Sequence, residues 1–227
     1  LLAIAVIWLA LGKLKEKNVE KKETPAIELE QNEISKEPVE IPIKRFVAVP
    51  FSMDIIKKKG CVADGILSGY TGNIGEMVSL IERSKCQYIH RAMETWLTPP
   101  DFDQAANVMA EFNKPGMVFG MFIAEAIDTG AKYYDVDSGE KFDFSEMCRS
   151  NTENSWGVHS CKPSFEKPEY RRYLKYITKR AMDIGIQSFL FGQIHYQNQQ
   201  PLPDSEMPEI IQYMRNYAKR KGIQIII

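Results

Sequence analysis

The sequence lacks the short motifs by which many enzyme and nucleotide-binding families are recognised. It has no C-x-x-C pair, no H-x-H or H-E-x-x-H metal motif, no G-x-S-x-G elbow and no glycine-rich phosphate loop. Histidine is scarce, with 3 in 227 residues, and 29 Lys and Arg balance 30 Asp and Glu. These absences argue against zinc ribbons, nucleotide-binding domains and nucleic-acid binders, so we expect no metal, no cofactor and no nucleic-acid partner.

The N-terminal region differs from the rest of the chain. Residues 1–12, LLAIAVIWLALG, form an apolar run shorter than the ~20 residues that span a bilayer. We expect a truncated membrane anchor or signal segment; a buried or fortuitous apolar segment is the alternative. Residues 13–44 are rich in Lys, Glu and Pro without an apolar period, which predicts an extended linker. The layout predicts a protein that is membrane-anchored facing outside, or secreted.

Residues 45–227 alternate between apolar runs and amphipathic stretches. The pattern predicts strands at 45–53, 86–96, 116–127, 186–194 and 223–227, and helices at 74–84, 100–113, 168–185 and 206–222. Such alternation indicates an α/β fold with a parallel sheet, either an open doubly wound sheet or a (β/α)8 barrel. Long polar loops after strands and short turns after helices favour the barrel. We therefore expect a partial (β/α)8 (TIM-type) barrel of about five strands, with further strands beyond Ile227.

The four cysteines bear on the cellular compartment. Cys148 and Cys161 bracket a loop without secondary-structure signals, and a bridge between them would stabilise the domain by about 3 kcal/mol. An oxidising compartment would favour that bridge, whereas a cytoplasmic one would leave two free thiols. Cys61 and Cys86 have no comparably obvious pairing.

Polar residues gather where the predicted strands end. The segments HRAME, IAE and GQIH bring His90, Glu94, Glu125, Gln193 and His195 to the side of the fold where a barrel places its active site. A lone histidine in such a place is more often a structural hydrogen-bonding group, whereas an ionised carboxylate is costly to bury without a role. Further carboxylates and aromatic rings lie in or near the following loops: Asp128, Asp135, Asp137, Trp96, Tyr133, Tyr134 and Trp156. The rings could stack on sugars, although loop packing explains them about as well. Arg91 lies on the opposite parity of its strand and could pair with a carboxylate structurally.

Three runs, CQYIHRAMETW, FGMFIAEAID and YRRYLKYITKRAMDIGIQSFLFGQIHYQ, give the chain a resemblance to a known architecture. Over residues 45–227 it resembles the N-terminal half of a glycoside-hydrolase-type (β/α)8 barrel, in architecture and strand-end style and without a family signature. Many retaining barrel glycosidases end strand four with Asn-Glu, the Glu being the acid/base. Here that strand ends in GQIHYQ, without a carboxylate.

The resemblance implies a glycoside hydrolase acting on a polysaccharide or cell-surface glycan. Its proton donor would be Glu125, which ends an otherwise apolar strand, or Glu94. The expected substrate-binding residues are His90, Gln193, His195, Trp96 and Trp156. The alternative is a noncatalytic, surface-tethered barrel that binds carbohydrate or a protein partner.

Overall fold

The computed structural model describes residues 46–70, 72–193 and 206–227, which belong to one compact unit spanning residues 43–227. The expected anchor (1–12), the expected linker (13–44) and His195 lie outside the described residues. None of the helices within the described ranges is long and apolar enough to cross a membrane.

Short helices and strands alternate along the described chain. In chain order they are α1 (Met53–Lys58), β1 (Gly60–Val62), the 3-10 helix η1 (Ile66–Ser68), α2 (Ile74–Arg83), β2 (Tyr88–Glu94), α3 (Phe102–Glu111), β3 (Val118–Ile123), β4 (Ile127–Asp128), the 3-10 helix η2 (Ser145–Met147), β5 (Ser160–Cys161), α4 (Pro168–Asp183), β6 (Ser188–Phe191) and α6 (Glu206–Lys221).

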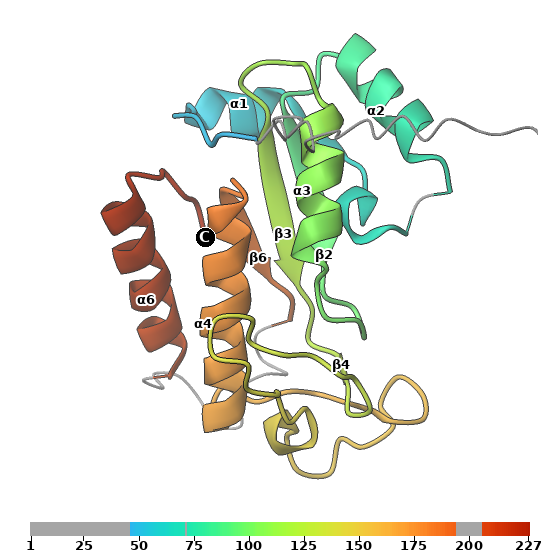
Figure 1. Ribbon diagram of the computed structural model, residues 1–227, viewed down its shortest axis with the longest axis vertical. Helices are drawn as coiled ribbons and strands as arrows, with labels where there is room; N and C mark the ends of the chain where they lie inside the picture. Colours follow the sequence, from blue (N-terminus) through green and yellow to red (C-terminus); the bar gives the residue numbers. More distant parts are fainter. Residues whose placement is uncertain (1–45, 71, 194–205) are drawn as a thin grey trace, which may run out of the picture. The chain divides into compact units, whose positions relative to one another are not determined.

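Four of these strands form a parallel sheet in the order β1-β2-β3-β6. Strands β2, β3 and β6 are labelled in Figure 1. Every neighbouring pair in that order runs parallel, and β3 pairs with β6 from Gly120↔Ser188 to Ile123↔Phe191. Strands β4 and β5 form a separate antiparallel pair. The predicted α/β fold with a parallel sheet is confirmed, and all its carboxyl ends meet at one edge because the strands run the same way.

The two faces of the sheet are covered differently. Ile89, Phe119 and Phe189 point to one face, where they join the main core with residues of α3, α4 and α6. On the opposite face Tyr88 and Val118 belong to a smaller cluster, formed with Phe51, Ile55, Ile56 and Ile226. The face that packs against the large helices therefore holds most of the core.

Helix boundaries follow local signals in the sequence. Asn73 caps α2 by accepting a hydrogen bond from the Glu76 N–H at 3.1 Å. Asp101 caps α3 by accepting from the N–H groups of Asp103 and Gln104 at 3.1 and 2.9 Å. Pro168 opens α4, where its missing N–H costs nothing. These three helices and α6 lie where the periodicity predicts them.

The prediction of a strand at 45–53 is wrong for the described part of that segment. Residues 46–52 form no strand, and α1 begins at Met53. Side-chain amides take the place of a strand ladder, because Gln187 donates to the Val49 carbonyl at 2.9 Å and Gln224 accepts from the Phe51 N–H at 3.0 Å. The first strand is β1, within a segment interpreted as loop; its three residues are too few to show a pattern.

The predicted strand at 223–227 is reduced to a single parallel bridge, between Ser188 and Ile226. The Phe189 N–H donates to the Ile226 carbonyl, and the Ile226 N–H donates to the Gln187 carbonyl, both at 2.9 Å. The C-terminal segment therefore lies beside β6 without forming a longer ladder.

All four cysteines are paired. Cys148 is bonded to Cys161, as an oxidising compartment would favour, and Cys61 is bonded to Cys86, a pairing that the spacing did not indicate. The bridge between Cys61 and Cys86 links β1 to the segment just before β2 and joins residues that are 25 positions apart in the sequence. Two disulfides in one domain are typical of extracellular proteins.

Removing the bridge between Cys61 and Cys86 should lower stability substantially. We expect the double variant Cys61→Ala/Cys86→Ala to lose about 3 kcal/mol of unfolding free energy, because the unfolded chain regains the entropy of an open loop. Urea denaturation of the oxidised proteins measures the difference. The wild-type protein should also lose stability in dithiothreitol, which reduces both bridges. A double variant with the same urea midpoint as the oxidised wild-type protein would contradict the expected effect of the bridge between Cys61 and Cys86.

Candidate functional site

The carboxyl edge of the sheet is held together by hydrogen bonds between successive strand ends. The Thr95 N–H donates to the Phe122 carbonyl at 3.1 Å, and the Thr95 hydroxyl accepts from the Ala124 N–H at 3.0 Å. The Gly192 N–H, just after β6, donates to the Ile123 carbonyl at 2.9 Å. These bonds fix the positions at which Glu94 ends β2 and Glu125 follows β3 along the same edge.

Glu94 is buried and engaged by a cation. Its side chain is 7% exposed, and its Oε1 accepts from Arg91 Nε at 2.8 Å and lies 2.7 Å from Arg91 Nη2. Its backbone N–H donates to the Ser68 hydroxyl at 2.8 Å. Arg91 Nε also lies 3.5 Å from a carboxylate oxygen of Asp64. The guanidinium thus bridges two acidic side chains at this edge.

Irregular backbone on β2 aims Arg91 at these partners. The register between β2 and β3 shifts between Ile89 and Met93, and Arg91 has a φ of 55°. Leu97, three residues beyond Glu94, also has a φ of 55°. Positive φ is uncommon for such side chains and occurs preferentially at functional sites. Strand bulges also redirect side chains. The register shift and the positive φ values together therefore set the geometry around Glu94.

Loss of Arg91 should leave Glu94 buried without its cation. We expect Arg91→Met to lower the unfolding free energy by about 1–2 kcal/mol, because a desolvated carboxylate loses its charged partner. Adding Glu94→Gln to that variant should restore part of the loss. Urea denaturation measures both, with Arg215→Met, an exposed change on α6, as the control. A double variant less stable than Arg91→Met alone would contradict the ion-pair explanation.

Glu125 is the more unusual carboxylate of the edge. Its residue is 1% exposed, and its Oε2 has no hydrogen-bond partner within the described residues. A Cβ added to Gly192 would lie 2.4 Å from that oxygen, so the carboxylate rests directly against the glycine backbone. Burial raises the pKa of the neighbouring Tyr170, and the negative charge of Glu125 raises it further. An unpartnered buried carboxyl oxygen is costly to fold, which makes this group a candidate for chemistry.

Phe122 connects the two carboxylates. The Arg91 guanidinium carbon lies 4.3 Å from the centroid of the Phe122 ring, in a cation–π arrangement. The far end of the same ring would lie 2.6 Å from a Cβ on Gly192, next to Glu125. One aromatic ring therefore separates the Arg91–Glu94 pair from Glu125.

The two tryptophans expected to bind substrate, Trp96 and Trp156, contact each other. The ring centroids of Trp96 and Trp156 lie 5.6 Å apart at an interplanar angle of 73°. Lys162 Nζ lies 5.5 Å from the Trp156 ring centroid, and the Tyr70 hydroxyl donates to the Trp96 carbonyl at 3.3 Å. Burial raises the pKa of Tyr70, and the charge of Glu94 adds to that rise. An aromatic pair thus follows directly after the Glu94 end of β2.

His90 does not reach the edge with the carboxylates. It lies within β2, where its Nδ1 is 2.8 Å from the Tyr88 hydroxyl, which in turn lies 3.0 Å from the Ser188 hydroxyl. Burial raises the pKa of Tyr88, while the hydrogen bond with Ser188 opposes the rise. Gln193 is exposed, with a φ of 32°, just beyond β6. His195 lies outside the described residues.

The loop carboxylates serve other contacts. Asp137 pairs with Lys179 on α4, and the hydrogen bond and charge of Lys179 lower the pKa of Asp137. Asp135 accepts from backbone N–H groups of its own turn, at 2.9 and 3.3 Å. Asp128 accepts from the Gly130 N–H at 2.8 Å. Within the described residues, no three His, Cys, Asp or Glu side chains are grouped to hold a metal ion.

Comparisons with known proteins find only distant likenesses. No family model and no curated protein matches the sequence. A candidate alpha-N-acetylgalactosaminidase of Bacillus halodurans C-125 is 11% identical, with a TM-score of 0.38, over 74% of this chain and 48% of that one. A GH27 β-L-arabinopyranosidase of Geobacillus stearothermophilus, solved with arabinose, is 12% identical, with a TM-score of 0.37, over 78% and 50%. The chain spans about half the length of either structure. Function has to be inferred from the residues of the site.

Sequence reasoning missed Gly192. It gave Arg91 only a structural pairing with a carboxylate, and the structure supplies Glu94 as that partner. A glycine within the apolar run FLFG is itself a signal, since glycine in a strand often marks a close approach of another group. The bulge that turns Arg91 toward Glu94 has no comparable signature, because it arises from the pairing of β2 with β3.

Proposed function

We propose that residues 45–227 belong to a (β/α)8 barrel glycoside hydrolase in which Glu125 is the proton donor and Glu94 the second carboxylate. The observation that carries the proposal is the buried Oε2 of Glu125, which has no hydrogen-bond partner among the described residues, at the carboxyl edge of a parallel sheet. Catalytic residues of barrels lie at that edge. The packing of the large helices on one sheet face supports a barrel over a doubly wound sheet.

The proposed chemistry divides between the two carboxylates. Glu125 transfers a proton to the glycosidic oxygen as the bond from that oxygen to the anomeric carbon breaks, and the oxygen keeps the bonding electrons. Glu94 stabilises the positive charge that develops on the sugar ring, while Arg91 fixes its Oε1. Water then adds to the anomeric carbon and releases its proton to the Glu125 carboxylate, which restores the acid.

The remaining residues of the proposed site hold the substrate. Trp96 and Trp156 offer ring surfaces to the apolar faces of a sugar. Gln193 and His195 are assigned to substrate hydroxyls, whereas His90, which contacts Tyr88 within β2, is not. An anchor or signal segment at residues 1–12 and a linker at 13–44 would place the domain outside the cell, in keeping with its two disulfides.

The test is hydrolysis of a panel of aryl glycosides and polysaccharides by the wild-type protein and its Glu125→Gln and Glu94→Gln variants. Glu153→Gln, in an exposed loop, is the matched control and should keep wild-type turnover. Wild-type turnover that neither Glu125→Gln nor Glu94→Gln reduces would overturn the assignment.

A noncatalytic carbohydrate-binding barrel is the second candidate. The observation that favours it is the ion pair between Arg91 and Glu94, which commits one of the two edge carboxylates to a protein contact. Under this alternative the wild-type protein hydrolyses no member of the panel but still binds polysaccharide. Binding would then depend on Trp96 and Trp156, and Glu125→Gln would leave it unchanged.

A further inference from the structure

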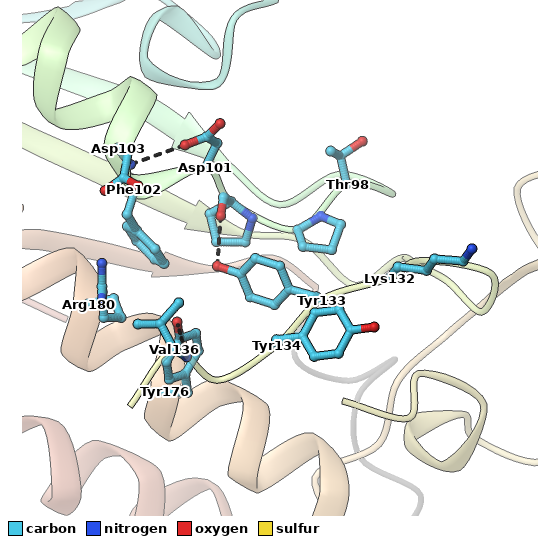
Figure 2. A pocket seen from close by; sticks show the side chains of 12 residues that line it. Thr98, Asp101, Phe102, Asp103, Lys132, Tyr133, Tyr134, Val136, Tyr176 and Arg180 are labelled. Carbon is cyan, nitrogen blue, oxygen red and sulfur yellow. Dashed lines mark hydrogen bonds between the residues drawn. The ribbon is translucent and has the colours of Figure 1, made fainter. Parts of the chain in front are cut away.

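A concave site lies outside the carboxylate edge. It is a pocket of about 380 Å³ between the start of α3, residues 132–136 and α4, shown in Figure 2. Three tyrosines, a phenylalanine and two prolines supply most of its apolar lining: Tyr133, Tyr134, Tyr176, Phe102, Pro99 and Pro100. Pockets that take small ligands combine such apolar walls with a few polar groups.

The walls of this pocket are fixed by hydrogen bonds. The Tyr133 hydroxyl donates to the Pro100 carbonyl at 2.7 Å, which ties the loop to the start of α3 (Figure 2). The Tyr176 hydroxyl, on α4, accepts from the Val136 N–H at 3.3 Å. Burial raises the pKa of Tyr133, so its hydroxyl stays protonated and keeps donating. Tyr134, between these anchors, leaves half of its surface exposed.

Arg180 differs from the other basic side chains of α4. Arg171 and Lys175 pair with Glu209, Arg172 pairs with Glu169, and Lys179 pairs with Asp137. Arg180 pairs with no carboxylate among the described residues and lies 5.8 Å from the Phe102 ring centroid. Its guanidinium therefore keeps hydrogen-bonding capacity at the wall of the pocket.

The charges that line the pocket balance. Asp101 and Asp103 come from the start of α3, and Lys132 and Arg180 from the facing loop and helix. No ion pair joins any two of these four side chains. A lining with donors, acceptors and no net charge does not favour an anion or a cation, but it suits a neutral ligand with several hydroxyl groups.

We propose that this pocket is a second carbohydrate site, which holds one ring of a neutral saccharide against Tyr134 with hydroxyls toward Arg180 and Asp101. The inference rests on the proposed function for its ligand class, and adds a subsite to it. Only Thr95, Trp96 and Leu97 separate Glu94 from Thr98, the first residue of the pocket lining. The pocket would hold a distant part of the same glycan chain that reaches the carboxylates.

Binding of neutral disaccharides tests the proposal. Cellobiose, maltose, xylobiose and galactobiose are titrated into the Glu125→Gln variant, with ligand-observed NMR and calorimetry as readouts. We expect at least one to bind, and binding to weaken at least tenfold in Tyr134→Ala and in Arg180→Gln. Tyr134→Phe, which keeps the ring, should weaken binding less than Tyr134→Ala. Arg215→Gln, an exposed change on α6, is the control and should bind normally.

The outcomes separate this site from the proposed catalytic one. Equal binding by Tyr134→Ala, Arg180→Gln and their parent would overturn the proposal, and so would absence of binding by every disaccharide. Binding of glucuronate-containing disaccharides alone would also overturn it, because the site would then select an anion. If Glu125→Gln loses hydrolysis but keeps disaccharide binding that depends on Tyr134 and Arg180, both sites are supported. If Glu125→Gln hydrolyses substrate at the wild-type rate, only the catalytic assignment is contradicted.

Discussion

Replacing Glu125 by glutamine is expected to slow glycan hydrolysis by about 10²–10⁴-fold and to stabilise the folded domain. The loss of turnover follows because an amide cannot supply the proton that the leaving oxygen needs. The gain in stability follows because an acidic group, whose Oε2 has no partner among the described residues, is replaced by an amide that cannot carry a charge into the buried site. Removing the ionisable group should raise the unfolding free energy by about 1 kcal/mol or more.

Urea denaturation at neutral pH and initial rates on the best substrate measure the two effects. Glutamine keeps nearly the same volume, so a change in packing does not account for either result. Glu153→Gln removes a carboxylate from an exposed loop and should change neither quantity. A Glu125→Gln variant that is both less active and less stable would point instead to a structural carboxylate, with a partner that holds it in the folded state.

Opposite effects on activity and stability distinguish functional groups from structural ones. A side chain selected for chemistry is kept although it destabilises the fold. A structural ion pair supports both stability and activity, so its removal should lower both. At this edge Glu94 has a cation partner at 2.7 Å, whereas Glu125 Oε2 rests against Gly192 without a hydrogen-bond partner among the described residues, so a gain in stability on substitution is expected at Glu125.

The helices of this domain could be predicted from the sequence because their signals are local. The apolar period and the capping groups Asn73 and Asp101 lie within the segments they define. Strands β3 and β6 lie within apolar runs, and β2 lies within the segment 86–96; all three were equally clear. β1 was not, since a three-residue strand is defined by its neighbour β2 and not by its own pattern.

The candidate site was predictable to the same extent. Glu94 and Glu125 could be placed at one edge because parallel strands end together, and Trp96 could be placed near them by sequence adjacency. Trp156 meets Trp96 through a long loop that the bridge between Cys148 and Cys161 closes, and no local signal gives that contact. Contacts between distant segments depend on packing, which periodicity does not encode.

Gly192→Ala is expected to impair the proposed site by displacing Glu125. The added methyl group would lie 2.4 Å from Glu125 Oε2 and 2.6 Å from the Phe122 ring, well inside normal contact distances. Overpacking of this kind costs about 1–3 kcal/mol of unfolding free energy. Displacing the carboxylate should also reduce turnover more than tenfold, because proton transfer requires precise placement of the acid.

A double-mutant cycle separates displacement of Glu125 from general damage. If Gly192→Ala acts through the carboxylate, combining it with Glu125→Gln should slow hydrolysis no further than Glu125→Gln alone, because the acid is already absent. Gly75→Ala, where the nearest atom to the new methyl is 3.7 Å away, is the control and should leave turnover unchanged. Fully additive losses would show that Gly192 affects hydrolysis by a route independent of Glu125. Non-additive losses would tie the strand end of β6 to Glu125, which follows β3, as the proposed active site at the carboxyl edge of the sheet requires.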